Sequence, residues 1–255
     1  MYDTVQTPTQ DTVSVTGNRM LDALPSSELE LLRSHCTLAA LDRQDHLYEP
    51  GAVIETIHFP VDGIVSLVCL MKDGGGVETA TIGREGMVGY SVFHGVRTGS
   101  QLAIVQIPGQ SYRLPTETFI ELLPQLPTLS RLLHRFTVLL FTLAAQNSGC
   151  NRKHSIEERC CRWMLMVAER LERETFELTH DFIAQMLGVR RASVTESLGA
   201  LEKRGLIKTS RGRITIVDRQ GLESSVCECY EVIRAAVSGV YDDVTDVTDR
   251  FRATA

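Results

Sequence analysis

The spacing of apolar residues in this 255-residue chain changes near Thr116, and that change restricts the possible folds more than any other feature. Between Leu47 and Leu114, short runs rich in Val and Ile alternate with Gly- and Pro-containing turn signals at intervals of roughly ten to twelve residues. Such spacing is typical of an antiparallel sandwich or jelly roll. The candidate strands are residues 53–59, 64–71, 77–82 and 102–107, and a short helix pair is expected over residues 21–32. Helical spacing follows Thr116, so the sequence predicts an α+β protein.

The helical region begins with a seven-residue repeat. Two series of residues, three positions apart, continue for about three and a half repeats, which is the pattern of a helix that pairs with another helix. We therefore expect a long helix over residues 126–151 to pair with its symmetry mate and make the chain a homodimer. The residues predicted to form this contact are Leu126, Leu129, Leu133, Phe136, Leu140, Leu143 and Asn147. A helix buried within one subunit is the alternative, and a second stripe is expected to face the chain's own sheet: Leu132, Val138, Leu139 and Ala145.

A second domain is expected after this helix. Residues 151–154 interrupt the repeat and are interpreted as a hinge. Ser155 and Glu158 then form a capping-box pattern, which is typical of a helix start.

The segment 178–201 has the pattern of a helix-turn-helix. Thr179 is placed to cap a short helix, Ala184 is small where a second helix must cross, and Gly188 permits the turn. The second helix is expected to bury one face, formed by Val194, Leu198 and Leu201. Residues 206–209 and 214–217 then alternate as two strands about a turn at Arg211, which indicates a basic wing.

Charge supports a nucleic-acid partner only locally. The whole chain has a net charge of −6, but residues 151–217 hold 13 basic and nine acidic residues. The outward face of the second helix and the wing offer side chains that reach phosphates and base edges. From the helix these are Arg190, Arg191, Ser193, Thr195 and Glu196, and from the wing they are Lys208, Arg211 and Arg213. A solvated charged face and a generic helical hairpin are the alternatives.

The sequences GVRRASVT at 188–195 and LEKRGLI at 201–207 resemble the Crp/Fnr superfamily, and the resemblance covers residues 21–218. It implies a cyclic-nucleotide-binding-like β-roll, a long dimerising helix, a hinge and a winged helix-turn-helix. It further implies that Arg191, Ala192 and Glu196 read bases, while Thr179, His180 and Ser193 contact phosphates. The implied partners are double-stranded DNA, a second copy of the chain and RNA polymerase.

The expected sensor departs from the family pattern. Nucleotide-binding rolls have Gly-Glu followed, about ten residues later, by an Arg that pairs with the cyclic phosphate. This chain has Gly89 and Tyr90, then Ser100 and Gln101, at the corresponding positions. We therefore expect an effector other than a standard cyclic nucleotide, or none, and its identity is unknown. A cyclic-nucleotide-responsive regulator with non-standard contacts is the alternative.

The seven cysteines are interpreted as buried or partly exposed thiols, with no metal site and no cofactor. Cys160 and Cys161, like Cys227 and Cys229, are expected to point to different faces of a helix. A jelly-roll enzyme is the rival function, but His58 and His94 stand apart in the sequence, so no enzyme activity is expected.

The predicted boundaries are a flexible leader at 1–20, the sensor at 21–125, the dimerisation helix and hinge at 126–151, the DNA-binding domain at 152–218 and a tail at 219–255. An amphipathic helix is expected over 221–240, followed by acidic residues. The start lacks the pattern of a signal peptide and no apolar run is long enough to span a membrane, so a cytoplasmic protein without a membrane partner is predicted.

Overall fold

The computed structural model describes residues 16–72 and 75–242. The predicted leader lies largely outside these residues, and the acidic tail lies outside them from residue 243. Within the described part, no helix combines the length and apolarity needed to cross a membrane.

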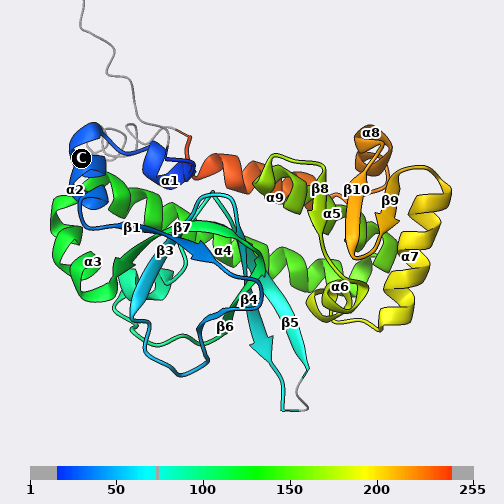
Figure 1. The fold of residues 1–255 in the computed structure, drawn as a ribbon, viewed down its shortest axis with the longest axis horizontal. Helices are drawn as coiled ribbons and strands as arrows, with labels where there is room; N and C mark the ends of the chain where they lie inside the picture. The colour runs from blue at the N-terminus through cyan, green and yellow to red at the C-terminus, as the bar shows by residue number, and fades with distance from the viewer. Residues whose placement is uncertain (1–15, 73–74, 243–255) are drawn as a thin grey trace, which may run out of the picture.

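The first half of the chain is a β-roll of two antiparallel sheets (Figure 1). One sheet has the order β1-β7-β3 and the other the order β2-β6-β4-β5. The roll is preceded by α1 (Arg19–Asp22) and α2 (Ser26–Arg33), and the short η1 (Tyr90–His94) lies between β5 and β6. The strands are β1 (Thr37–Leu41), β2 (His46–Tyr48), β3 (Thr56–Pro60), β4 (Ile64–Leu70), β5 (Gly76–Ile82), β6 (Leu102–Ile107) and β7 (Gly109–Pro115). The predicted α+β architecture is confirmed, and each of the four predicted strands corresponds to an observed one.

Helices dominate the second half. The 27-residue α4 (Pro127–Lys153) runs along the roll and connects it to a smaller domain at the far end of the molecule (Figure 1). The other elements are α3 (Thr116–Leu122), η2 (Leu123–Gln125), α5 (Ile156–Leu171), β8 (Thr175–Glu177), α6 (His180–Leu187), α7 (Arg191–Lys203), β9 (Ile207–Ser210), β10 (Arg213–Ile216), α8 (Arg219–Glu223) and α9 (Cys229–Gly239). Strand β8 had no counterpart in the prediction.

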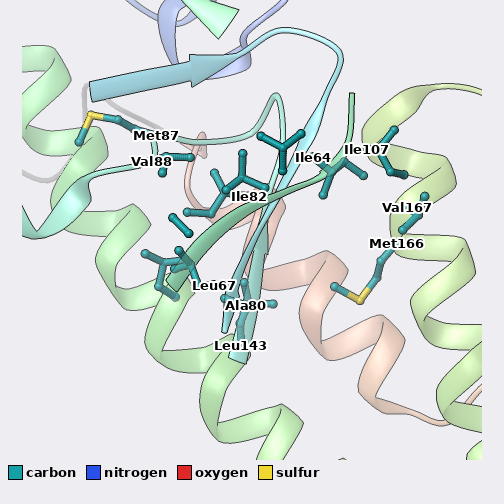
Figure 2. Close-up of a cluster of buried hydrophobic side chains, with 14 of the residues drawn as sticks. Ile64, Leu67, Ala80, Ile82, Met87, Val88, Ile107, Leu143, Met166 and Val167 are labelled. Carbon is teal, nitrogen blue, oxygen red and sulfur yellow. The ribbon is translucent and has the colours of Figure 1, made fainter. Parts of the chain in front are cut away.

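One hydrophobic core joins the two halves. Figure 2 shows side chains of β4, β5 and β6 packed beside Leu143 of α4 and beside Met166 and Val167 of α5. All of these side chains are buried. Because α5 begins the second domain, that domain is packed directly on the roll.

The predicted dimer seam on α4 lies inside the chain, which corrects the assignment of that face. Leu126, Leu129, Leu133, Phe136, Leu140 and Leu143 are all buried within the single chain. The ring of Phe136 lies so close to Gly86 that an added Cβ there would come within 2.2 Å of it. Asn147 was expected to meet its counterpart across a two-fold axis, but its side-chain amide donates to the backbone oxygen of Thr79 at 2.9 Å. A heptad pattern indicates which face of a helix is apolar but not what covers it. Here the chain's own β-roll covers that face.

A different face of α4 is left exposed. The side chains of Val138 and Phe141 are 65% and 75% exposed, and Ala145 is exposed on the same stripe. Two members of the stripe predicted to face the sheet, Val138 and Ala145, therefore point outward, although Leu132 and Leu139 are buried as expected.

The predicted hinge begins three residues later than expected. Helix α4 continues to Lys153, and the chain changes direction at His154, whose backbone is extended. The capping box is confirmed, since the Ser155 hydroxyl accepts from the Glu158 amide and the Glu158 carboxylate accepts from the Ser155 amide. Without a helix-breaking residue in 151–153, the helix ends only where the next N-cap requires an extended backbone.

Two buried polar contacts help to hold the second domain on the roll. Arg170 of α5 pairs with Glu85, 2.7 Å apart, and both side chains are buried. The Trp163 indole, also on α5, donates to the Glu78 carboxylate of β5 at 3.2 Å.

The buried carboxyl of Glu78 is expected to make the stability of the protein depend on pH. Burial raises the pKa of its carboxyl to about 7, although hydrogen bonds from Ser66 and Trp163 and the charges of Arg162 and Arg170 favour the ionised form. The folded chain then holds a proton that the unfolded chain releases near its ordinary pKa of 4.5, so this group makes stability fall as pH rises from about 4.5 to about 7. The Glu78→Gln variant should lose that part of the pH dependence. Thermal melting of both proteins from about pH 5 to about pH 8 measures it, and parallel profiles would contradict the assignment.

The C-terminal segment forms two helices where one was predicted. Residues 224–228 interrupt the expected helix between α8 and α9. Helix α9 packs along α4 and also contacts α5. Beyond α9, the Tyr241 hydroxyl donates to the backbone oxygen of Glu85 at 2.5 Å, so the segment returns to the roll.

Candidate DNA-binding surface

Helices α6 and α7 form the predicted helix-turn-helix, at the end of the molecule away from α2 (Figure 1). The Thr179 hydroxyl caps α6 by accepting from the Phe182 amide at 3.2 Å. Gly188 ends α6 with φ +62°, a left-handed conformation that glycine adopts without strain. Glycine at position 188 therefore permits the turn between α6 and α7.

Helix α7 separates a buried face from an exposed one. Val194, Leu198 and Leu201 are buried, with exposures of 1% or less. The opposite face presents side chains that the sequence analysis assigned to DNA. Arg191, Ala192, Thr195 and Glu196 are exposed, and Ser193 is half-buried. The packing thus leaves the predicted base-reading residues free of the core.

The two helices are also joined on their outer side. The ring nitrogen Nδ1 of His180 and the hydroxyl of Thr195 lie 2.9 Å apart. His180 begins α6 and Thr195 lies one turn into α7, so this hydrogen bond fixes their separation. Both residues were predicted to contact DNA, and the structure places them side by side.

Arg191 is held by a contact that is easily broken. Its Nε lies 3.4 Å from Asp181 Oδ1, and the two side chains are 67% and 66% exposed. Ion pairs between exposed groups contribute about 0–1 kcal/mol. A phosphate or a guanine edge can therefore displace Asp181 at little cost in free energy.

The start of α7 is positively charged, which is unfavourable for an isolated helix. Helix N-termini favour acidic residues and side-chain caps. Here Arg190 is the N-cap and makes no side-chain cap, Arg191 follows it, and the first turn holds no acidic residue. Such an end favours an approaching anion, because the helix dipole and both guanidinium groups act in the same direction.

The wing is a three-stranded sheet in the order β8-β10-β9. Arg211 and Gly212 form its two-residue tip with φ angles of +47° and +77°. Arg211 holds this conformation although residues with a Cβ disfavour it. Lys208 is exposed on β9, as predicted.

Glu177 links Arg213 of the wing to Arg43 of the roll. Glu177 of β8 lies 3.2 Å from Arg213 and 3.1 Å from Arg43, which follows β1 of the roll. This bridge between the domains was not predicted, because nothing local in the sequence relates Arg43 to the wing.

The predicted effector residues contact neighbouring side chains of the roll or lie at its surface. Gly89 lies against Ile57, where an added Cβ would come within 2.8 Å of a side-chain carbon. The Gln101 amide donates to the Thr79 hydroxyl, Ser100 is exposed and Tyr90 is half-buried. Three cavities identified among residues 16–72 and 75–242 are lined by other residues.

The cysteines divide into two kinds. Cys160 and Cys161 are buried in the core of the second domain, in agreement with the prediction of buried or partly exposed thiols. Cys227 and Cys229, however, converge with Cys150 and His154. Cys227 and Cys229 do not lie on different faces of one helix, as was predicted, because Cys227 precedes α9 in an irregular segment.

Comparison with known proteins agrees with this geometry. Residues 158–225 match the family model of the Crp-like helix-turn-helix domain. Over 185 residues the chain is 26% identical to the global nitrogen regulator of Synechocystis sp., an alignment spanning 69% of this chain and 82% of that protein. The solved structure of FixK2 from Bradyrhizobium japonicum has a TM-score of 0.63 at 17% identity, over 75% of this chain and 98% of that one. The c-di-GMP-responsive regulator CLP of Xanthomonas campestris gives 0.60 at 13% identity, over 75% and 99%.

Proposed function

We propose that this chain is a Crp/Fnr-type transcription regulator that binds a specific DNA sequence as a homodimer, since residues 158–225 match the Crp-like helix-turn-helix domain. The exposed face of α7 carries this proposal. In such a complex α7 enters the major groove, where Arg191 donates to a guanine edge and Glu196 accepts from a cytosine amine. Thr179, His180, Arg190 and the wing residues contact phosphates, which supply affinity without sequence preference.

The exposed stripe of α4 supports the homodimer. Val138, Phe141 and Ala145 recur at spacings of three and four residues, as in a seam between paired helices. Large apolar side chains that are 65% and 75% exposed lose contact with water when a second copy covers them. A two-fold axis along α4 then sets the two recognition helices at a fixed spacing, which selects DNA with two half-sites.

A filled roll supports DNA binding without a standard cyclic nucleotide. Phe136 occupies the space between α4 and the loop at Gly86, and Tyr48 lies against Gly99, where an added Cβ would come within 2.5 Å of its ring. No Arg stands at Ser100 to pair with a cyclic phosphate. The function proposed is therefore recognition of DNA rather than catalysis, with RNA polymerase as a further partner.

Substitution of Arg191 tests the base-reading role. The Arg191→Ala variant is expected to bind its operator about 5- to 150-fold more weakly, which corresponds to about 1–3 kcal/mol. Lys208→Ala is expected instead to weaken specific and non-specific DNA alike and to reduce the salt dependence. Fluorescence anisotropy with DNA from the gene's upstream region and with scrambled DNA distinguishes the two.

The control is Arg97→Ala, which removes an exposed arginine of the roll that pairs with Glu117. This variant should bind DNA as the wild type does. Equal affinity of wild type and Arg191→Ala for every sequence would refute base reading by α7.

A further inference from the structure

Four side chains with metal-binding atoms meet at the junction between the roll's long helix and the second domain. Cys150 lies in the last turn of α4 and His154 is its C-cap, while Cys227 and Cys229 lie on either side of Glu228 at the start of α9. The four ligand atoms all lie within 4.8 Å of one another, and the three cysteines are buried. Neither the DNA-binding surface nor the exposed stripe of α4 uses these residues.

Two of the six separations among the four ligand atoms match the edges of a small tetrahedron. The sulfur atoms of Cys150 and Cys227 are 3.7 Å apart, and the Cys229 sulfur is 3.5 Å from His154 Nδ1. Zinc bonds of about 2.3 Å to sulfur and about 2.0 Å to nitrogen give tetrahedral edges of about 3.8 Å and about 3.5 Å. The geometry thus fits a single ion at the centre of the four atoms.

Two neighbouring groups are placed to orient the ligands. The other ring nitrogen of His154, Nε2, lies 3.1 Å from the Glu228 carboxylate, an arrangement that directs Nδ1 toward the sulfur atoms. The Gln146 amide donates to the Cys229 sulfur at 3.1 Å. Both contacts are of the kind that holds metal ligands in place in known sites.

Cysteine binds a metal as the thiolate. Three thiolates and one divalent cation leave one net negative charge, and the guanidinium of Arg162, whose charge acts on Cys150, is placed to offset it.

We propose that Cys150, His154, Cys227 and Cys229 bind one Zn²⁺ ion in a tetrahedral site with three sulfur ligands and one nitrogen ligand. Binding forms three Zn–S bonds and one Zn–N bond, and the thiol protons pass to solvent without any change of oxidation state. A disulfide between Cys150 and Cys227 would explain less of the geometry. It would join two sulfur atoms and leave Cys229, His154 and Glu228 without a role. An iron–sulfur cluster needs its thiolates spread around a larger core than atoms within 4.8 Å of one another can enclose.

The ion would connect two segments that are far apart in the sequence. Cys150 and Cys227 are separated by 77 positions, and the ion would fasten the start of α9 to the end of α4. Because the hinge at His154 belongs to the site, the ion also fixes the direction in which the chain enters α5. Zinc thereby couples the C-terminal segment to the position of the DNA-binding domain.

Metal content tests the proposal. The full-length chain, purified without a histidine tag and under reducing conditions, is expected to contain zinc at a ratio near one per chain by mass spectrometry. Cys150→Ser and Cys227→Ser should each lose it. Cys36→Ser and Cys69→Ser, which alter the two half-buried cysteines of the roll, are matched controls and should retain it.

Spectroscopy and melting distinguish loss of the site from loss of the fold. With Co²⁺ in place of Zn²⁺, we expect the visible bands of tetrahedral cobalt and thiolate-to-cobalt charge transfer, both absent in Cys227→Ser. Glu228→Gln should keep these bands and weaken zinc binding about 10–100-fold, since Glu228 only orients His154. Added zinc should raise the melting temperature of the metal-free wild type and not that of Cys227→Ser. No zinc binding under reducing conditions, a Cys150–Cys227 disulfide in anaerobically purified protein, or iron with sulfide would each overturn the proposal.

Discussion

We expect the Phe141→Asp variant to be a monomer that binds its DNA site about 10²- to 10⁴-fold more weakly than the wild-type chain. In the proposed dimer, Phe141 lies between two copies of α4, where a carboxylate would be buried without a partner. A monomer engages one half-site at a time and loses the gain that comes from linking two binding events, which is of that order. Val138→Asp, one turn earlier on the same stripe, should have the same effect. Light scattering after gel filtration measures the mass, and anisotropy measures the affinity.

The control is Leu38→Asp, which places the same charge at an exposed apolar residue of β1. This variant should remain dimeric and bind DNA normally. Because Phe141 is 75% exposed in the single chain, its substitution should not lower the stability of the monomer itself. A dimeric Phe141→Asp protein with wild-type affinity would exclude the exposed stripe as the interface.

The second large effect is expected from Arg170→Ala. Arg170 and Glu85 form a buried pair 2.7 Å apart, with side-chain exposures of 7% and 3%. Removal of one partner leaves a buried charge without its counterion and destabilises a protein by about 3–5 kcal/mol. In a chain of this size the melting temperature should fall by about 6–20 °C. Differential scanning calorimetry measures the change.

A double variant separates the charge from the packing. Arg170→Met combined with Glu85→Gln removes both charges and keeps much of the volume, so it should recover most of the lost stability. If Arg170→Ala melts at the wild-type temperature, the pair contributes nothing to the docking of α5 on the roll. If the double variant is as unstable as the single one, the hydrogen bond from Arg170 to the Met166 backbone oxygen is the important contact.

Local patterns were sufficient for most of the fold and of the DNA-binding surface. The alternation of Val and Ile between Gly-containing turns predicted the strands of the roll, because an amphipathic strand repeats every two residues. Thr179, Gly188 and the buried face of α7 predicted the helix-turn-helix, since each requirement is met within a few residues. The observed wing strands differ from the prediction by a single residue at each end.

Features that depend on distant parts of the chain were not predictable in this way. The repeat of α4 identified an apolar face, but an apolar stripe is the same whether a second subunit or the chain's own sheet covers it. The burial of this face within the single chain, with Phe136 packed against Gly86, decides between them. In the same way, Cys150 and Cys227 are 77 positions apart, so their sequence spacing gave no sign that they meet.

The loop between Gly83 and Gly86 has a consequence for the order in which the chain is made. This loop receives the Asn18 amide, 68 positions away, the Arg170 guanidinium, 85 positions away, and the Tyr241 hydroxyl, 156 positions away. The roll therefore leaves the ribosome before Arg170 and Tyr241 have been translated. Until then, Glu85 in this loop lacks its contacts with those two residues. Contacts of such long range form late and slowly. We expect chains stalled on the ribosome before residue 170 to be cut by protease near this loop, and completed chains to resist.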